Sequence, residues 1–250
     1  ILCLSTNKSE YYLLRYCNGH LVLYGVSVRI NRNIIFYNQD EVAREEAGVS
    51  VRINRNIIFY NWLCGHQRKN ESREASLLGR KEVLTGKAKF GIFGDGKEIP
   101  QLAMAKVFRN GDFRSGYYRD QTFMFATGNL TLQEWFAGLY AHTDVDVEPM
   151  SAGRQMGGHF GTRSLNADGT WKNLMTIKNS SADVSPTGSQ MPRLLGLAMA
   201  SKYFKQNPEL HATKFNIFSD KGNEIAFGTI GDASTSEGLF WETINAAGVM

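Results

Sequence analysis

The sequence predicts an α/β fold in which a largely parallel sheet is flanked by helices. Three observations support this class. Apolar residues recur at helical spacing in several segments after residue 70, and residues 223–230 have the length and apolar composition of a buried strand. Strand-like and helix-like segments also alternate along this part of the chain, which is typical of layered domains with parallel strands. The length of 250 residues permits one or two domains.

Three helices are expected in the first half of this region. Residues 72–84 carry apolar and small residues at helical spacing, and residues 98–108 follow with Pro100 in the first turn, where a missing N–H is tolerated. Thr131 and Glu134 have the spacing of a capping box that begins the third helix. The residues expected on its buried face are Trp135, Leu139 and Tyr140.

A helix, a strand and a final helix are expected in the second half. Pro192 begins the first of these, and the strand at 223–230 runs into a turn at 231–232. Residues 234–237 have the pattern of a second capping box, which would begin a helix that continues to Asn245. The residues that would permit close packing of the Pro192 helix are Leu195, Gly196, Ala198, Ala200 and Ser201.

The first 70 residues are interpreted as an atypical N-terminal extension, separate from a domain at 71–250. A 14-residue segment at 25–38 is repeated at 48–61 without one change. Structural repeats usually diverge at their surface positions, so an unvaried copy indicates recent duplication or an error in defining the gene. Two interpretations stay open: a pair of β-strands, because apolar and polar residues alternate within the segment, or an irregular extension.

The composition is that of an ordinary globular protein. Apolar residues make up 42% and charged residues 21%, no apolar run reaches 18 residues, and the net charge of +4 is spread along the chain. We therefore expect neither a membrane span nor nucleic-acid binding. Cys3, Cys17 and Cys64 are odd in number and lack CxxC spacing, which favours a reducing, cytoplasmic compartment (the mitochondrial matrix in a eukaryote) over a disulfide framework or a zinc site.

Chemistry is expected where the last strand meets the last helix. A strand end that leads into a helix N-terminus favours anions, because free backbone N–H groups and the helix dipole both point there. Asp232 in that turn could hold a divalent metal that bridges to a phosphate. The alternative, that Asp232 is only a turn residue and Ser234 only a helix cap, stays open.

The segment 231–238, together with Glu242 and the Asn-Ala-Ala at 245–247, resembles the thiamine-diphosphate motif of 2-oxoacid dehydrogenase E1 alpha subunits. That motif opens with Gly-Asp-Gly, continues through a Ser-Glu-Gly-like segment to Asn-x-Ala-Ala, and ends with an Asn-Asn pair or its equivalent. Ala233 stands where the family has a glycine, and the chain is expected to be truncated before the strand with the second metal-binding side chain. The resemblance implies magnesium binding by Asp232. The residues that it implies at the cofactor in this segment are Gly231, Asp232, Ala233 and Ser234.

Three further blocks resemble the same family in the expected order. Residues 117–120 resemble its Tyr-Arg-Asp block, which implies that Tyr118 and Arg119 contact the cofactor diphosphate. Residues 153–160 resemble the Gly-Arg-Gln-Met-x-x-His segment of the branched-chain type, which implies a catalytic role for His159.

The third block, residues 185–192, resembles the family segment Ser-Pro-Leu-x-Thr-Gln-x-Pro. The resemblance places Ser185 and Thr187 at the cofactor and Ser189 and Gln190 at a structural potassium site. A literal Gly-Asp-Gly also occurs at 94–96, but it lacks the downstream Asn-x-Ala-Ala. We therefore assign its aspartate to a segment leading into a helix.

The resemblance implies a three-layer thiamine-diphosphate-binding fold, incomplete at its C-terminus, and an E1 alpha subunit closest to the branched-chain type. The expected reaction is oxidative decarboxylation of a 2-oxo acid, with acyl transfer to a lipoyl group on E2. Thiamine diphosphate and magnesium are the expected cofactors, with potassium as a structural ion. The expected partners are an E1 beta subunit or a fused beta-type domain, and the lipoyl domain of E2. Two alternatives stay open: an acetoin dehydrogenase or transketolase-like thiamine enzyme, and an inactive truncated fragment with only a binding role.

Overall fold

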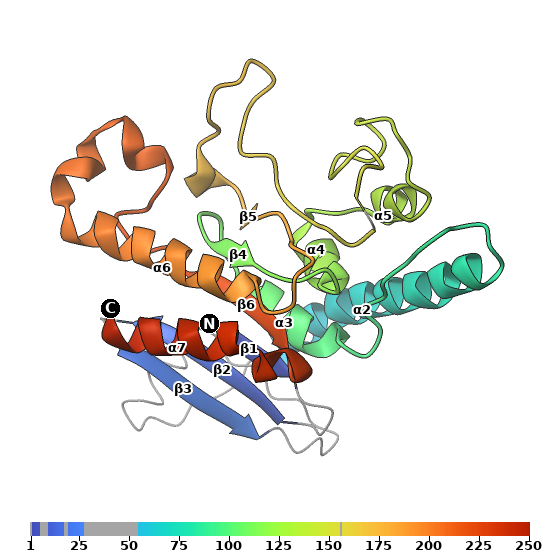
Figure 1. Cartoon of the computed structure of the whole chain (residues 1–250), viewed down its shortest axis with the longest axis horizontal. Coiled ribbons are helices and arrows are strands. Elements are labelled where there is room, and N and C mark those ends of the chain that lie inside the picture. Colours follow the sequence, from blue (N-terminus) through green and yellow to red (C-terminus); the bar gives the residue numbers. More distant parts are fainter. Residues whose placement is uncertain (1, 6–9, 18–19, 28–54, 156) are drawn as a thin grey trace.

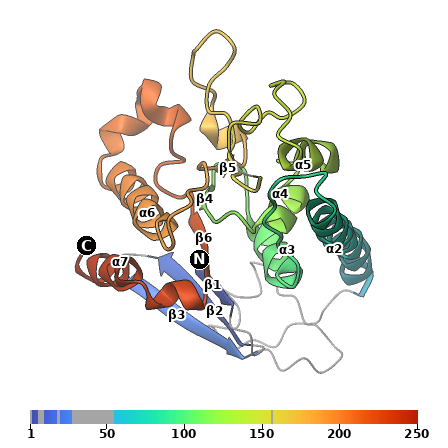
Figure 2. The same cartoon turned by 45° about the vertical axis from the view of Figure 1, so that its right-hand side comes forward.

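The chain forms a six-stranded sheet with helices on both faces (Figure 1; Figure 2). The computed structural model describes residues 2–5, 10–17, 20–27, 55–155 and 157–250. The strand order is β3-β2-β1-β6-β4-β5, and the four strands from β1 to β5 in that order run parallel, which confirms the predicted class. The antiparallel strands β2 and β3 extend one edge. The strands are β1 (Leu2–Ser5), β2 (Glu10–Cys17), β3 (His20–Ser27), β4 (Phe113–Ser115), β5 (Asn179–Ser180) and β6 (Ala226–Gly231).

Helices cover the two faces of the sheet and make the three layers that were predicted. Helices α6 and α7 lie on one side of β6, and α2, α3 and α4 lie on the other (Figure 2). The α-helices are α2 (Arg55–Leu84), α3 (Glu98–Val107), α4 (Gln121–Thr127), α5 (Leu132–Leu139), α6 (Gln190–Gln206) and α7 (Gly238–Val249). Short 3-10 turns are η1 (Leu174–Thr176), η2 (Pro208–Ala212), η3 (Lys214–Ile217) and η4 (Ala233–Ser236).

The capping box before α5 forms as predicted. The Thr131 hydroxyl accepts the Glu134 N–H at 3.2 Å, and the Glu134 carboxylate accepts the Thr131 N–H at 2.7 Å. The buried-face residues Trp135 and Leu139 are buried. Tyr140 is not, which corrects the prediction. It follows the last residue of the helix and is 48% exposed, and its phenol donates to the Glu82 carboxylate at 2.7 Å.

The second predicted capping box is wrong. Residues 233–236 form the 3-10 turn η4, and α7 begins only at Gly238, with no side-chain cap from Glu237. The reason is that the Glu237 N–H donates to the Ser234 carbonyl oxygen at 3.2 Å, so it is satisfied by the backbone rather than by a serine hydroxyl.

The close approach predicted for Gly196 of α6 also fails, because no heavy atom lies within 4 Å of where its Cβ would be. The tight contact between α6 and the sheet is made by a glycine of the strand instead. A Cβ on Gly228 of β6 would lie 2.6 Å from Cδ2 of Leu194.

The described ends of the two repeat copies differ from each other in secondary structure. Residues 25–27 of the first repeat copy are the end of β3, while residues 55–61 of the second copy begin α2. The strand interpretation is therefore wrong for the helical end of the second copy, and most of both copies lies outside the described residues. Helix α2 runs across residue 70, and the domain boundary placed there stays a prediction.

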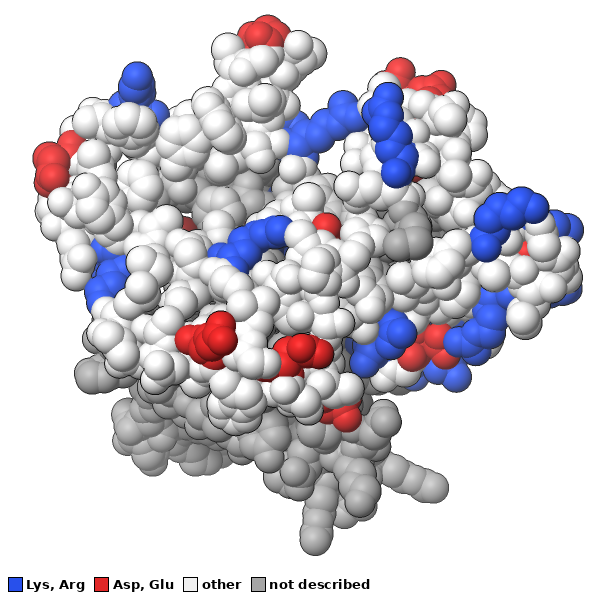
Figure 3. All heavy atoms as spheres, in the orientation of Figure 1, with Lys and Arg blue, Asp and Glu red and all other residues white. Residues whose placement is uncertain are grey.

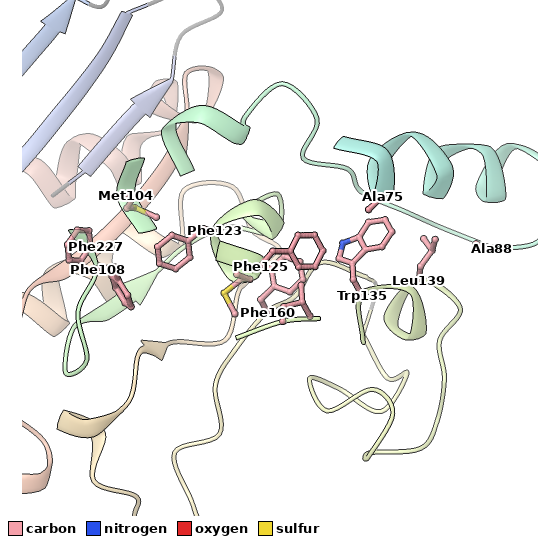
Figure 4. Close-up of a cluster of buried hydrophobic side chains, with 12 residues drawn as sticks. Ala75, Ala88, Met104, Phe108, Phe123, Phe125, Trp135, Leu139, Phe160 and Phe227 are labelled. Carbon is pink, nitrogen blue, oxygen red and sulfur yellow. The ribbon is translucent and has the colours of Figure 1, made fainter. Parts of the chain in front are cut away.

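The core centres on β6 and on aromatic residues that face it from the α3–α4 side. The ring centroid of Phe108 lies 5.0 Å from that of Phe123 and 5.0 Å from that of Phe227, and both contacts are edge-to-face (Figure 4). Phe123 and Phe227 are completely buried, and burying such a side chain stabilises a fold by about 1.5–3 kcal/mol. On the opposite face, α6 and α7 pack on β6 through the buried cluster of Met191, Ile230 and Phe240. Strand β6 is thus packed on both sides, which fixes where the turn after it begins.

The surface shows no single basic face in the view of Figure 3, where Lys and Arg side chains lie in separate groups with Asp and Glu between them. None of the helices in the described ranges is both long enough and apolar enough to cross a membrane.

Candidate functional site

The predicted site residues lie at the carboxyl ends of three parallel strands. Tyr118 and Arg119 follow β4, Ser185 follows β5, and Asp232 follows β6 directly. Because these strands are parallel and adjacent, their carboxyl ends share one edge of the sheet, where α/β folds bind ligands. Two of the loops adjoin: a Cβ on Gly188 would lie 4.0 Å from the Ser234 carbonyl oxygen.

His159 is held against residues of two of these loops. Its Nε2 is hydrogen-bonded to the Ser185 hydroxyl at 2.7 Å, and its ring centroid lies 6.0 Å from that of Tyr118. The preceding Gly158 has a φ of 94°, and a Cβ there would lie 2.6 Å from the Tyr118 carbonyl oxygen. Only glycine fits that conformation and that approach without strain, so Gly158 is what allows the histidine loop to lie on Tyr118.

The Arg119 side chain lies against two aromatic rings. Its guanidinium carbon lies 5.9 Å from the ring centroids of both Tyr117 and Tyr118. Its Nε is buried and has no hydrogen-bond partner within the described part of the chain, so a donor is left for a ligand. Its backbone is fixed as well, because the Gln101 amide donates to the Arg119 carbonyl oxygen at 2.9 Å and a Cβ on Gly94 would lie 2.5 Å from that oxygen.

Tyr117, beside Arg119, keeps its proton at any physiological pH. Burial raises the pKa of Tyr117 to about 12, against the opposing effect of the nearby Arg119 guanidinium. Its ring centroid lies 4.3 Å from that of Tyr118, so the two tyrosines form one apolar support beneath the guanidinium.

The turn after β6 presents Asp232 and Ala233 to solvent. The Asp232 carbonyl oxygen accepts the N–H and the hydroxyl of Thr235, at 3.1 and 2.6 Å. A Cβ on Gly231 would make only an ordinary contact, 3.7 Å from the Ser234 hydroxyl oxygen. Within the described ranges no group of three His, Cys, Asp or Glu side chains could hold a metal.

The segment between β5 and α6 is tied to the sheet at its end. The Gln190 amide donates to the Thr229 carbonyl oxygen at 2.9 Å, and the Ser115 hydroxyl donates to the Gln190 carbonyl oxygen at 2.9 Å. Ser189 precedes α6 without capping it through its side chain, and Thr187 is exposed.

Not all the predicted residues touch one another. Tyr118, His159 and Ser185 form a chain of contacts, whereas no hydrogen bond or ion pair joins Asp232 to Arg119 among the residues that the structure describes. What Asp232 and Arg119 share is the edge of the sheet. The aspartate of the literal Gly-Asp-Gly, Asp95, lies elsewhere, just before α3, in an ion pair of 2.7 Å with Arg80.

Sequence reasoning missed a buried ionic network beneath these loops. Arg114 of β4 is fully buried and pairs with Asp120 at 2.7 Å and with Asp183 at 3.1 Å. Burial lowers the pKa of Arg114, but the carboxylates of Asp183 and Asp120 outweigh it and keep that pKa above its ordinary value. Burial raises the pKa of Asp183 to about 6, against the opposing effect of Arg114 and with a further rise from Asp120. A charged residue inside a short strand was the available signal, but Phe-Arg-Ser also fits a strand whose arginine faces water.

Comparison with known proteins identifies a family and a similar curated protein. A family model described as "Dehydrogenase E1 component" matches residues 69–250. The "2-oxoisovalerate dehydrogenase subunit alpha" of Bacillus subtilis (strain 168) is 30% identical over 166 residues, which are 66% of this chain and 40% of that relative. The chain thus spans well under two thirds of the length of the curated relative that it matches.

Proposed function

This chain belongs to the dehydrogenase E1 component family, and on that premise we propose that it is the alpha-type part of a thiamine-diphosphate-dependent 2-oxoacid dehydrogenase. The proposed reaction is oxidative decarboxylation of a 2-oxo acid, with transfer of the acyl group to a lipoyl group on E2. The observation that supports it best is the convergence of three strand-end loops, which place Arg119, with its unpaired buried donor, beside the contact chain Tyr118–His159–Ser185.

The residues at this edge fit a diphosphate and its metal. Arg119 offers the planar fork that suits phosphate oxygens, on a backbone held by Gln101. Tyr118, Ser185 and Thr187 would add hydroxyl groups from the loops after β4 and β5. The turn after β6 would add Asp232 for magnesium, and its remaining proposed cofactor contacts are Gly231, Ala233 and Ser234.

Thiamine diphosphate, when bound, supplies the electron sink for decarboxylation, and the protein supplies binding, orientation and electrostatics. The 2.7 Å hydrogen bond between His159 Nε2 and the Ser185 hydroxyl holds the imidazole ring in one orientation. We assign to His159 the stabilisation of substrate or of a reaction intermediate. We also propose a structural potassium ion at Ser189 and Gln190, which lie where the loop after β5 is anchored to β4 and β6.

The substrate class follows the relative, whose name specifies 2-oxoisovalerate. We propose a branched-chain 2-oxo acid as substrate, with an E1 beta subunit or fused beta-type domain and the E2 lipoyl domain as partners, in a cytoplasmic or mitochondrial-matrix compartment. An acetoin dehydrogenase or transketolase-like activity is the alternative within thiamine enzymes, and profiling of substrates with the assembled complex separates them. A protein with only a binding role is the second candidate, and it would show no turnover in the same profiling.

The proposal is tested by magnesium-dependent binding of thiamine diphosphate, measured by calorimetry with and without a beta-type partner. We expect Arg119→Ala to weaken binding by about 10- to 100-fold, since a hydrogen bond to a charged group contributes about 1.5–3 kcal/mol. Arg163→Ala is the matched control, because Arg163 is an exposed arginine that donates to the Pro149 carbonyl oxygen. Equal affinity of the Arg119 variant and the unmodified chain would count against the proposed site.

A further inference from the structure

We propose that Arg114 is a positioning residue that holds the diphosphate-binding loop and the His159–Ser185 pair in one fixed arrangement. It bonds to Asp120 at the end of the loop and to Asp183, which lies beside the pair. This inference rests on the proposed function and goes beyond it, because Arg114 lies within a strand and is fully buried. It is assigned no contact with cofactor or substrate.

One arm of the arrangement fixes the loop that carries Tyr118 and Arg119. Arg114 donates from Nε and Nη2 to the same oxygen of Asp120, at 3.2 and 2.7 Å, and Nη2 also donates to the Tyr117 carbonyl oxygen at 3.1 Å. That Asp120 oxygen also accepts the Tyr117 N–H at 3.1 Å. Both ends of the four-residue loop 117–120 are therefore fixed: Tyr117 by bonds to Arg114 and to the Asp120 carboxylate, and Asp120 by its bonds to Arg114.

The other arm fixes the segments on either side of the histidine contact. Arg114 Nη2 donates to Asp183 at 3.2 Å, and the same Asp183 oxygen accepts the Phe160 N–H at 3.2 Å. Phe160 follows His159 in the chain, and Asp183 lies two residues before Ser185. Asp183 therefore ties the histidine loop to the segment that carries its serine partner, and Arg114 ties both to β4.

The arrangement also reaches the two neighbouring strands. Arg114 Nη1 donates to the Ser180 hydroxyl of β5 at 2.7 Å, and the Thr229 hydroxyl of β6 bonds to Asp120. The Arg114 guanidinium of β4 thus contacts β5 directly and is linked to β6 through Asp120, so it connects the three strand ends at which the site is built. A lysine keeps the charge, but its single ammonium cannot reproduce a planar fork with partners on several sides.

The bonding of Arg114 predicts a different outcome from simple loss of stability. Arg114→Lys keeps a buried positive charge but loosens the 117–120 loop, and a displacement of about 1 Å at a positioned group can cost about 100-fold. We expect thiamine diphosphate with magnesium to bind at least about 10-fold more weakly to this variant, in calorimetry on the chain with its beta-type partner.

Asp183→Asn is the second variant. It leaves the Arg114–Asp120 pair in place but weakens the bonds that hold the segments carrying His159 and Ser185. We expect kcat to fall by about 10-fold or more, on the same positional argument. Cofactor affinity should fall less than in Arg114→Lys, because the loop that carries Tyr118 and Arg119 keeps its bonds to Arg114 and Asp120.

Asp112→Asn is the matched control for the loss of a buried carboxylate. Asp112 lies immediately before the opposite end of β4, where its oxygens accept the N–H groups of Arg109 and Ile225 at 2.7 and 2.8 Å. It is 4% exposed, like Asp183. This variant should lower the melting temperature without changing cofactor affinity or kcat.

Three results would overturn the inference. If Arg114→Lys folds and binds the cofactor as the unmodified chain does, Arg114 has no positioning role. If Asp112→Asn weakens binding as much as Arg114→Lys does, the effect is one of stability alone. If Arg114→Lys does not fold, Asp183→Asn alone decides: an unchanged kcat in that variant would show that Asp183 does not position His159 and Ser185. Failure of the unmodified chain with its partner to bind the cofactor would instead overturn the proposed function, and the inference with it.

Discussion

Replacing Asp183 with asparagine should change how the stability of the protein depends on pH. Asp183 is buried, and its pKa of about 6 lies above the ordinary 3.8 of an aspartate because burial disfavours the charged form. The folded protein therefore holds the Asp183 proton more tightly than the unfolded chain does. The stability that this proton contributes is complete below about pH 4 and is lost as the pH rises through about 6.

The magnitude follows from the two pKa values. The step from 3.8 to about 6 corresponds to about 3 kcal/mol in the free energy of unfolding. Roughly 1 kcal/mol of it should appear between pH 8 and pH 5, because over this range the carboxyl becomes protonated in the folded state only. Asparagine cannot titrate, so this part of the pH dependence should vanish in Asp183→Asn. Any change that the lost ionic bonds make to the free energy of unfolding of the variant is the same at every pH.

The measurement is urea denaturation of both proteins at several pH values from 5 to 8. The free energy of unfolding of the unmodified protein should rise by about 1 kcal/mol relative to that of the variant as the pH falls across this range. Asp168→Asn provides a control that should leave the pH dependence between pH 5 and 8 unchanged. Hydrogen bonds from the Thr170 hydroxyl and N–H lower the pKa of Asp168 below its ordinary 3.8, so this group stays ionised throughout that range. Parallel curves for the unmodified protein and Asp183→Asn would refute the assignment of a raised pKa to Asp183.

Two further predictions concern the scaffold. Thr131→Ala removes the hydroxyl that caps α5, and thermal unfolding should show a loss of about 1 kcal/mol; no loss would mean that the capping box contributes nothing. Gly94→Ala would place a Cβ 2.5 Å from the Arg119 carbonyl oxygen, so we expect a loss of about 1–3 kcal/mol and weaker cofactor binding. Gly196→Ala, in an open position of α6, should instead stabilise the protein by about 0.5–1 kcal/mol, and equal effects of the two alanines would contradict the steric argument.

The sequence was most informative where one local pattern admits one structure. Thr131 and Glu134 can satisfy each other only at a helix start, and that helix forms where it was predicted. The alternation of segments correctly indicated a parallel sheet, and a parallel sheet in turn brings the loops after β4, β5 and β6 to one edge. The position of Asp232 after a strand was predicted from the local pattern. Tyr118 and Ser185 were assigned to the site by the family resemblance alone, because no strand was predicted before either of them.

The errors arose where one pattern fits two structures. Ser-Thr-Ser-Glu after β6 fits a capping box and also a 3-10 turn, and backbone bonds at 235 and 237 favour the turn. Tyr140 has the spacing of a buried helical residue, but the helix ends at Leu139, so its ring turns outward to Glu82. Arg114 was missed because local spacing does not reveal partners that are brought to it by tertiary folding from 6 and 69 residues away.

The buried network also constrains the order in which its members can be replaced during evolution. Losing Arg114 first would leave Asp120 and Asp183 buried close together without a counter-charge, and removing one partner of a buried pair costs about 3–5 kcal/mol. Losing the Asp183 charge first leaves one guanidinium matched to one carboxylate, which is a balanced pair. If the three charged residues are replaced by uncharged ones, the least destabilising first substitution is therefore the one at Asp183. The three positions should show strong energetic coupling when they are substituted in combination.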